Sequence, residues 1–431
     1  MKSIATLPVI LGLIVVFSGK AWAETKPTIS GSFERGYRFT DLDEDVDLLG
    51  RENEDLVYRY DKGYLKIVQP FKWGEASFKY KYFIRNYSGP NRNRNSHTHY
   101  FTPGLKYKLT DIYTLGLKLE IKDKNYTHGG IDDNLTLSPS IELGIKPRPK
   151  ESYKLKYSYK HQDFPNNSIK DNQLHILAFS ARKEFIDCLT LKGRTRALYK
   201  DYKHTAPQRK DFWKESFTLG SKYHRRKTYL PIIDLSLTRG HRATSLDEDI
   251  PFQATQEEGD AYRFHKGYIK YTQPIGKKYE PFFKYEFDDK DYYYSVDRNK
   301  DSIAQDYTPG LKVKVTKKVT IKGLVTIKDK DYENLEVNDY RVISPSIEFR
   351  FRPKVATLYL IKYTHKNQDY LRDPTRDNHQ NILLLSWRGR VTKDLTLKAK
   401  YELLVKNYNH PSPQRRDTTK HLVSTGFEYK F

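Results

Sequence analysis

The stretch from Tyr113 to Lys124 reads YTLGLKLEIKDK, and its alternation decides the fold. Leucine or isoleucine occupies every odd position from 115 to 121, and lysine or glutamate occupies every even position from 118 to 124. Successive side chains of a β-strand point to opposite faces, so this spacing gives a strand one apolar face and one charged face. A helix would scatter both sets around its circumference, and the stretch is therefore predicted to be a strand.

The same alternation continues along nearly the whole chain after residue 28 and predicts ten strands in each half. In the first half the expected strands span residues 28–39, 56–71, 76–88, 97–109, 113–126, 134–146, 151–162, 172–184, 189–202 and 211–224. In the second half they span residues 229–243, 260–273, 280–294, 303–316, 319–332, 340–351, 356–370, 378–391, 395–408 and 418–431. The chain is therefore expected to be all-β.

The connections between these strands alternate between two kinds. One kind is tight, as at residues 72–74, 110–111, 147–150 and 392–394. The other kind is longer and rich in Asp, Asn, Gly and Pro, as at residues 40–55, 89–96, 128–133 and 163–171. Short turns at one end and longer loops at the other are typical of a transmembrane β-barrel. A soluble sandwich has no reason to sort its connections in this way.

The chain also contains an internal repeat. Residues 307–431 repeat residues 101–225 at a constant offset of 206, and the earlier part matches at an offset of 204, where Arg35-Gly36 returns as Arg239-Gly240. Repeat 1 spans about 28–225 and repeat 2 about 229–431, with only a tight turn between them. We therefore expect one barrel of about 20 strands rather than two ten-strand barrels, with the first and last strands paired so that no edge is left.

Residues 1–23 have the layout of a secretory signal peptide. Lys2 precedes an apolar run that ends at Phe17, and small residues at Ala21 and Ala23 mark the expected cleavage site. The run is shorter than the roughly 20 apolar residues that a membrane-spanning helix needs. We therefore expect export, cleavage after Ala23 and a mature barrel of residues 24–431.

The ends and the strand pattern together resemble the porin-like β-barrels of Gram-negative outer membranes. The chain has 35 tyrosines, many near strand ends, and its last residues place Phe427, Tyr429 and Phe431 on one face. The resemblance implies an outer-membrane location among lipid and lipopolysaccharide, and it implies that these three aromatic residues are read by the barrel-assembly machinery. The basic, tyrosine-rich strands are also similar to those of oligogalacturonate-specific porins.

In a membrane the apolar face of each strand must look outward to lipid, so the charged face must look into the lumen. This inversion makes a large set of basic residues candidates for the pore lining. In the first half they are Lys106, Lys108, Lys118, Lys122, Lys154, Lys156, Arg182, Lys192, Arg194, Arg196 and Lys200. In the second half they are Lys312, Lys314, Lys328, Lys362, Arg388, Lys398, Lys400 and Lys406, which predicts two facing walls of positive charge.

The charge of the chain indicates what such a pore would pass. The formal net charge is +23, and removing the signal peptide takes away two lysines and no acid. Fixed cations around a water-filled tube favour anions, so we expect passive diffusion of small anionic solutes. Arg209 and Arg415, in a recurring Pro-Gln-Arg loop, are candidates for the pore mouth. An exported protein rarely meets nucleic acid, so we expect no nucleic-acid partner.

Two other interpretations remain open. Part of the positive charge is expected to pair with Glu120, Glu142, Glu348 or Glu402 and to serve only the polarity of the wall. A barrel of 20 strands is also wider than porins of 16 to 18 strands, and nothing in the chain resembles a plug. The barrel is then a sleeve for a periplasmic partner, resembling those that encase a multihaem cytochrome in outer-membrane electron conduits.

The sequence favours neither catalysis nor a cofactor. Its 13 histidines are scattered, and no phosphate-binding loop or haem-attachment motif appears, so we expect no enzyme activity and no cofactor. The acidic runs at residues 43–45 and 247–249 are compatible with calcium but are better explained as solvated loop tips. His97 and His99 are interpreted as loop polarity rather than as metal ligands, and the single Cys188 is given no role.

Overall fold

The computed structural model describes residues 26–42, 58–88, 94–127, 133–186, 188–203, 211–224, 230–244, 261–292, 301–333, 338–411 and 417–430. Its first ten strands are β1 (Thr28–Leu42), β2 (Tyr58–Phe71), β3 (Gly74–Tyr87), β4 (Ser96–Lys108), β5 (Tyr113–Tyr126), β6 (Asn134–Ile145), β7 (Glu151–Asp163), β8 (Asn172–Ile186), β9 (Leu189–Tyr202) and β10 (Phe212–His224). The second ten are β11 (Ile232–Thr244), β12 (Tyr262–Thr272), β13 (Tyr279–Tyr292), β14 (Ser302–Lys314), β15 (Val319–Tyr332), β16 (Tyr340–Phe351), β17 (Thr357–Tyr370), β18 (Asn378–Arg390), β19 (Leu395–Tyr408) and β20 (Thr418–Lys430).

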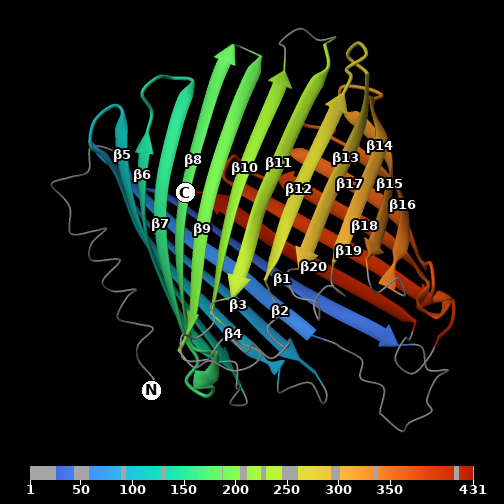
Figure 1. The fold of residues 1–431 in the computed structure, drawn as a ribbon, viewed down its shortest axis with the longest axis horizontal. Helices are drawn as coiled ribbons and strands as arrows, with labels where there is room; N and C mark the ends of the chain where they lie inside the picture. Colours follow the sequence, from blue (N-terminus) through green and yellow to red (C-terminus); the bar gives the residue numbers. More distant parts are fainter. Residues whose placement is uncertain are drawn as a thin grey trace.

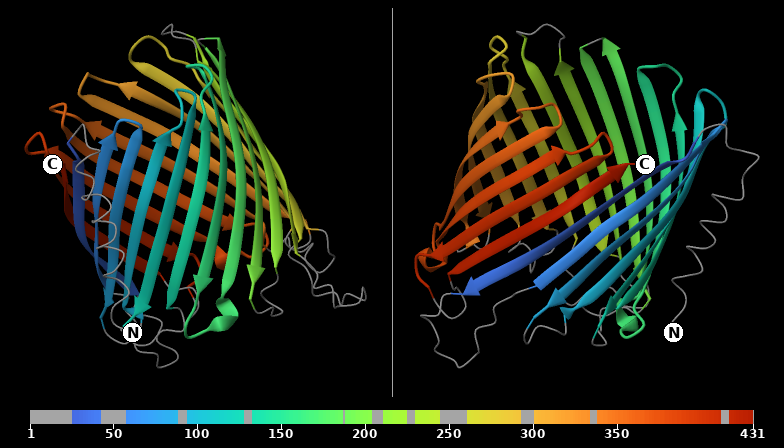
Figure 2. Two further views of the ribbon diagram at one scale, coloured as in Figure 1. Left: turned by 90° about the vertical axis from the view of Figure 1, so that its left-hand side faces the viewer. Right: turned by 180° about the vertical axis from the view of Figure 1, so that it is seen from behind.

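These strands form one closed antiparallel barrel (Figures 1 and 2). Each strand pairs with its neighbour in the chain, and β1 pairs with β20 through a register that includes Ser30↔Lys430. The halves join without a break, because β10 pairs with β11 along its whole length. The prediction of one barrel of about 20 strands is confirmed. Closure leaves no unpaired strand edge.

The two ends of the barrel differ, as expected. Short turns lie at the upper end in Figure 1, and the longer connections lie at the lower end. Threonine builds several short turns: the Thr110 hydroxyl accepts the N–H groups of Ile112 and Tyr113, each at 3.1 Å. Thr316 and Thr392 have the same role in the β14–β15 and β18–β19 turns. The start of β1 and the end of β20 both lie at this short-turn end.

The long-loop end is closed by a repeated hydrogen bond, which we call the hairpin clamp. An Asp or Asn just before the strand that leaves each of these loops accepts the backbone N–H of a residue at or next to the end of the strand that enters the loop. The Tyr126 N–H donates to Asp133 at 2.6 Å, and the Tyr87 N–H donates to Asn95 at 2.5 Å. Further clamps join Phe164 to Asp171, Tyr202 to Asp211, Tyr292 to Asp301, Tyr332 to Asp339, Tyr370 to Asp377 and Tyr408 to Asp417.

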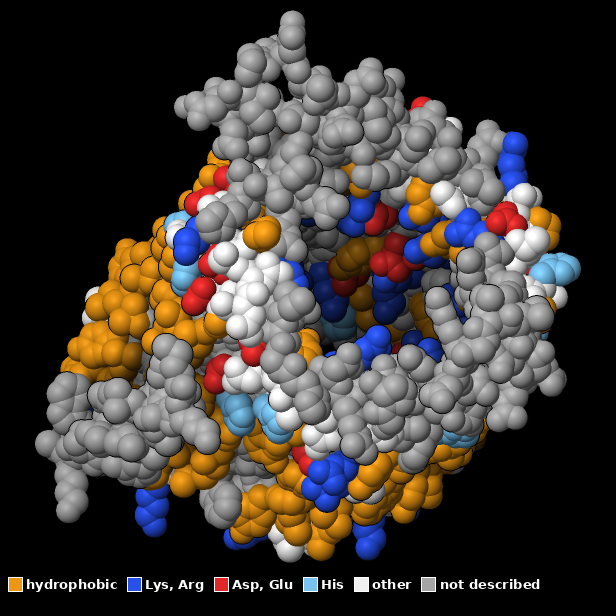
Figure 3. All heavy atoms as spheres, turned by 90° about the horizontal axis from the view of Figure 1, so that it is seen from below, with side chains coloured by type: hydrophobic (Ala, Val, Ile, Leu, Met, Phe, Trp, Pro, Cys, Tyr) orange, Lys and Arg blue, Asp and Glu red, His pale blue; other side chains and the backbone are white. Residues whose placement is uncertain are grey.

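The outer face of the barrel carries the large apolar side chains. They stay exposed in the isolated chain, as with Leu237 at 53% and Ile347 at 55%, and in Figure 3 apolar atoms cover the outside of the wall. Outward tyrosines lie towards both ends, for example Tyr113 and Tyr279 near the short turns and Tyr199 near the long loops. No described side chain is fully buried, because the strands surround a hollow instead of a solid core.

Near the long loops the outer face becomes polar, and histidines that are scattered in the sequence gather there. They are His97, His99, His161, His175, His241, His265, His365, His379 and His421. Several are fixed by tyrosines on the adjacent strand, such as His175 Nδ1 and the Tyr157 hydroxyl at 2.9 Å. On the same outer face, Arg35 forms an ion pair with Asp61 at 2.6 Å. Among the described residues no helix is long and apolar enough to cross a membrane.

Candidate functional site: the lumen wall

One continuous face of the sheet lines the hollow. The register carries this face around the barrel through even-numbered residues on every strand except β3, where it passes through odd-numbered ones; Glu75, for example, pairs with Lys106, and Lys106 with Gly116. All the basic residues predicted to line the pore lie on this face. Figure 3 views the barrel from the long-loop end and shows Lys and Arg side chains inside the hollow.

Lysine and arginine outnumber acids on this lumen face roughly three to one among the described strands. The acids are Glu34, Glu75, Glu120, Glu142, Glu184, Asp234, Glu280, Glu286, Asp288, Asp306, Glu348, Glu402 and Glu428. Because opposite charges this close neutralise each other, the pairs they form decide which cations stay available.

Ion pairs hold a part of the predicted lining. Lys118 lies 3.3 Å from Glu120, and Lys154 lies 3.1 Å from Glu142. In the second half, Lys400 pairs with Glu402 at 2.7 Å, Lys328 with Asp306 at 3.8 Å, and both Lys312 and Lys314 with Glu280 at 2.7 and 2.6 Å. Arg388 and Lys398 share Glu428. Pairing therefore accounts for much of the charge in the second half.

The first half keeps a group of cations that no acid holds, which we call the cationic strip. It consists of Lys156 on β7, Arg182 on β8, and Lys192, Arg194 and Arg196 on β9. Arg182 and Lys192 are direct cross-strand partners. None of the five makes an ion pair or a side-chain hydrogen bond with another described residue, and the nearby Glu184 pairs with Lys150 at 3.9 Å. The two predicted walls of positive charge therefore differ in how many of their cations are held by acids.

The difference between the walls follows from two positions of the repeat at which the first half has a basic residue and the second half has an acid. Arg196 corresponds to Glu402, which lies beside Lys400, the counterpart of Arg194. Lys222 corresponds to Glu428, which holds the counterparts of Arg182 and Lys192. Free guanidinium groups can grip a carboxylate or phosphate through two parallel hydrogen bonds. The strip is therefore well suited to anions.

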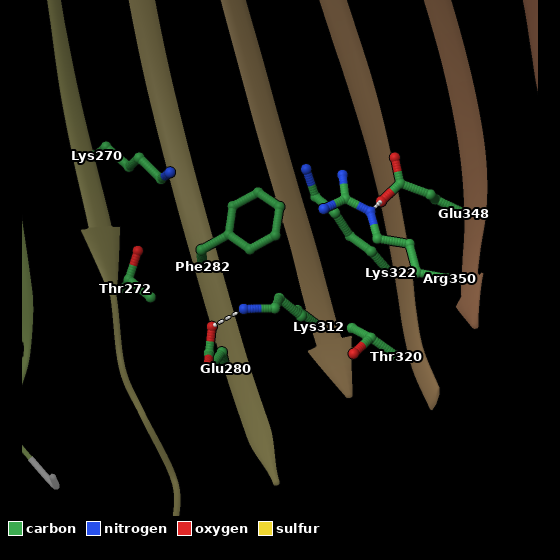
Figure 4. Close-up of a pocket in the computed structure, with 9 residues that line it drawn as sticks. All are labelled: Lys270, Thr272, Glu280, Phe282, Lys312, Thr320, Lys322, Glu348 and Arg350. Carbon is green, nitrogen blue, oxygen red and sulfur yellow. Dashed lines mark hydrogen bonds and ion pairs between the residues drawn. The ribbon is translucent and has the colours of Figure 1, made fainter. Parts of the chain in front are cut away.

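A pocket of about 270 Å³ opens on the lumen wall of the second half, between β12 and β16 (Figure 4). Two ion pairs frame it: Lys312 with Glu280 at 2.7 Å, and Arg350 with Glu348 at 2.6 Å. The ring of Phe282 lies between Lys270 on one side and Lys322 on the other, with Arg350 close to Lys322. Neither Lys270 nor Lys322 forms an ion pair within the part of the chain that the structure describes.

The long-loop mouth of the lumen carries an inward ring of tyrosines that the sequence prediction missed. Lys200 lies 4.2 Å from the centre of the Tyr202 ring and donates to its hydroxyl at 2.6 Å, and Lys330 and Tyr332 repeat this arrangement at 4.3 and 2.6 Å. Lys124 with Tyr126 and Lys406 with Tyr408 do the same. The spacing Lys-x-Tyr, which recurs before several of the long loops, was the available signal. Lys200 and Lys406, predicted as free lining, are thus held by tyrosine.

Three predicted residues lie outside the described part of the chain: Arg209, Arg415 and Phe431. Phe427 and Tyr429 occupy the outer face of β20, and the Phe427 ring lies 6.2 Å from Phe33 across the closing seam. The described residues contain no group of three or more His, Cys, Asp or Glu side chains placed to hold a metal ion. The acidic runs at 43–45 and 247–249 also lie outside the described residues.

Solved structures show the same fold at very low sequence identity. A point mutant of the ferric enterobactin receptor from Pseudomonas aeruginosa has a TM-score of 0.61 at 10% identity, over 95% of this chain and 81% of that one. The copper transporter OprC has a TM-score of 0.58 at 9% identity, over 95% and 82%. OccK9 (OpdG) of Pseudomonas aeruginosa has a TM-score of 0.50 at 10% identity, over 94% and 99%. No family model and no curated protein matches the sequence.

Proposed function

We propose that the protein is an outer-membrane channel of a Gram-negative bacterium through which small anionic solutes diffuse passively. The apolar outer face of a closed barrel supports the membrane location, because only closed barrels and helices satisfy their backbone groups in lipid. The likeness in fold to OccK9 and to the receptor barrel supports it further. We propose no catalytic activity for this lining.

The cationic strip is the observation that carries the anion preference. Its cations have no acid partners among the described residues, so a passing anion meets them without first displacing a carboxylate. A unit charge about 4 Å from an anion is worth roughly 4 kcal/mol at an effective dielectric of 20, against about 1 kcal/mol in bulk water. Several such cations on adjacent strands lower the energy of an anion along the wall and raise that of a cation.

The test is the reversal potential of refolded protein in planar bilayers under a KCl gradient. We expect a potential that favours chloride over potassium. Arg196→Glu replaces a residue of the strip by its second-half counterpart. It is expected to reduce the chloride preference, because the new carboxylate lies beside Arg194. Glu402→Arg makes the reverse change on the opposite wall and should increase it. A cation-selective channel, or selectivity unchanged by both variants, contradicts the proposal.

A sleeve for a partner is the second candidate, favoured by the width of the barrel. Apart from two 3-10 turns, Ser168–Lys170 and Pro374–Arg376, every described element is a strand of the wall. The lumen of so wide a barrel can house a partner such as a multihaem cytochrome. Purification from the native membrane tests this: a non-conducting barrel with a stoichiometric, haem-bearing periplasmic protein supports the sleeve. An empty, conducting barrel rules it out.

A further inference from the structure

The pocket of Figure 4 has a counterpart in the first half, built on the same register. Glu280 pairs with Lys312 as Glu75 pairs with Lys106. Thr320 and Glu348 likewise correspond to Thr114 and Glu142. Three positions differ in kind: Phe282, Lys322 and Arg350 stand where the first half has Ser77, Gly116 and Gly144. The small residues leave a wider cavity of about 600 Å³ in the first half.

Phe282 is an apolar residue on a charged lumen face, where a ring gains little by facing water. The wall is shaped to receive it: the ring lies over Gly310, where an added Cβ would collide with the ring itself. Lys270 Nζ and Lys322 Nζ lie 5.6 and 5.2 Å from the ring centre, on either side of it in Figure 4. The ring is thus flanked by two ammonium groups.

The carboxylates of the pocket are already engaged in ion pairs, whereas these two ammonium groups are not. Glu280 accepts from Lys312 and Lys314, and Glu348 pairs with Arg350. Lys270 and Lys322 both contact the Phe282 ring, and Lys322 also lies across from Glu348, whose ion-pair partner is Arg350. The pocket therefore presents a flat apolar surface with unpaired positive charge at its edges.

We propose that this pocket is a binding subsite for a carboxylate attached to a flat ring, a proposal that rests on the proposed anion channel. The ring of the solute stacks on Phe282, and its carboxylate accepts hydrogen bonds from Lys270 or Lys322. An aromatic pair adds stabilisation beyond buried area, and a charge-assisted hydrogen bond is stronger than a neutral one. A carboxylate without a ring lacks the first contact, and a neutral ring lacks the second.

The test is block of single-channel current by benzoate, with acetate and benzyl alcohol as probes that lack the ring or the charge. Benzoate is expected to dwell longer in the pore than either. Phe282→Ser, the first-half residue, should weaken benzoate block by roughly threefold to tenfold. Lys322→Gly should weaken it by about tenfold or more. Phe282→Ser should leave acetate dwell nearly unchanged, whereas Lys322→Gly should shorten it too, because acetate keeps the contact with the ammonium group. Galacturonate in place of benzoate distinguishes a sugar ring from an aromatic one.

Two controls separate this subsite from a general effect of folding or charge. Phe282→Leu keeps an apolar side chain without the flat ring and should also weaken benzoate block. The double variant Ser77→Phe with Gly116→Lys, on the opposite wall, should add a second site. The subsite proposal is wrong if benzoate and acetate block the current equally, or if Phe282→Ser leaves benzoate block unchanged. Either result in an anion-selective channel leaves the channel proposal intact.

Failure of the channel itself is measured separately. If the barrel does not conduct, ligand-detected NMR of benzoate with the refolded barrel still reports binding. Benzoate signals that depend on Phe282 and Lys322 then support the subsite although the proposed channel has failed. Signals that both substitutions leave unchanged overturn it.

Discussion

Individual charged residues in the lumen differ mainly in what holds them. Lys312 and Arg350 are fixed by glutamates, Lys200 is fixed over a tyrosine ring, and Arg194 and Arg196 are held by no described acid. A cation already paired with a carboxylate offers a passing anion much less than one whose charge is uncompensated. Residue identity alone therefore overstates the number of cations that act on a solute.

Asp301 gives a prediction about pH. It lies just before β14, is only 4% exposed, and accepts the Tyr292 N–H at 2.6 Å. Burial, with Asp291 and Glu333 nearby, raises the pKa of its carboxyl above the usual value. A raised folded-state pKa means that the ionised form costs stability at neutral pH, and that this cost disappears as the pH falls through that pKa.

Asp301→Asn should therefore raise the urea midpoint at pH 7, with the gain shrinking as the pH falls. The amide can still accept the hydrogen bond, as Asn95 does at the corresponding position of the first half. Tryptophan fluorescence during unfolding gives the midpoints. Asp301→Ala removes the hydrogen-bond acceptor and should lower the urea midpoint both at pH 7 and at acidic pH. A midpoint of Asp301→Asn below that of the unchanged protein at pH 7 would refute this assignment.

At the scale of elements, the hairpins follow one rule. Strands that enter a long loop carry a lumen-facing Lys, Arg or Gln two residues before an aromatic residue. The backbone N–H of that aromatic residue forms the hairpin clamp, as in Lys330-Asp331-Tyr332 with Asp339. The clamp satisfies a backbone donor where the ladder stops. It also explains why Asp recurs directly before the strands that leave the long loops.

The seam between β1 and β20 should be sensitive to side-chain size. A Cβ added at Gly426 would collide with the Phe33 carbonyl oxygen of β1, whereas a Cβ at Gly193 or Gly323 meets nothing within 4 Å. Overpacking of this kind typically costs roughly 1–3 kcal/mol. Gly426→Ala should therefore lower the temperature at which the folded band is lost on gels, and Gly193→Ala and Gly323→Ala should not. Equal behaviour of all three would mean that the seam has room to spare.

At the scale of the whole molecule, the duplication produces unequal walls of one pore. Strands β8 and β9 lie ten strands away from β18 and β19 in a closed ring of twenty, so the cationic strip faces its paired counterpart across the lumen. A net positive field therefore remains, and it is stronger on the side of the strip. The Phe282 pocket, between β12 and β16, adds a local site on the other half.

The field of the whole wall should respond to salt. The Debye length falls from about 30 Å at 0.01 M to about 3 Å at 1 M, so the strip reaches across the pore only in dilute solution. Chloride preference should be strong in a tenfold gradient at low concentration and should approach neutrality near 1 M. Arg196→Glu should show a flatter dependence. Selectivity that ignores salt would point to binding at one tight site instead of a wall field.

The alternation of side chains was enough to predict the strands, their number and the lumen face. The period of two is a local property, so each strand and its two faces could be identified from the residues of that strand alone. The segment 113–126, expected from its leucines, is β5 within its predicted bounds. Sequence patterns likewise placed Lys106, Arg194 and Lys312 on the charged face of their strands.

Only the tertiary structure decided which of those charges are free. Lys398 and its counterpart Lys192 look equivalent in sequence, yet Glu428 from β20 engages Lys398, and nothing described engages Lys192. Register between strands, which joins residues far apart in the chain, determines such partners. The same holds for the scattered histidines and for Phe282 between its two lysines. One strand specifies which way a side chain points; only the assembled wall specifies what it meets there.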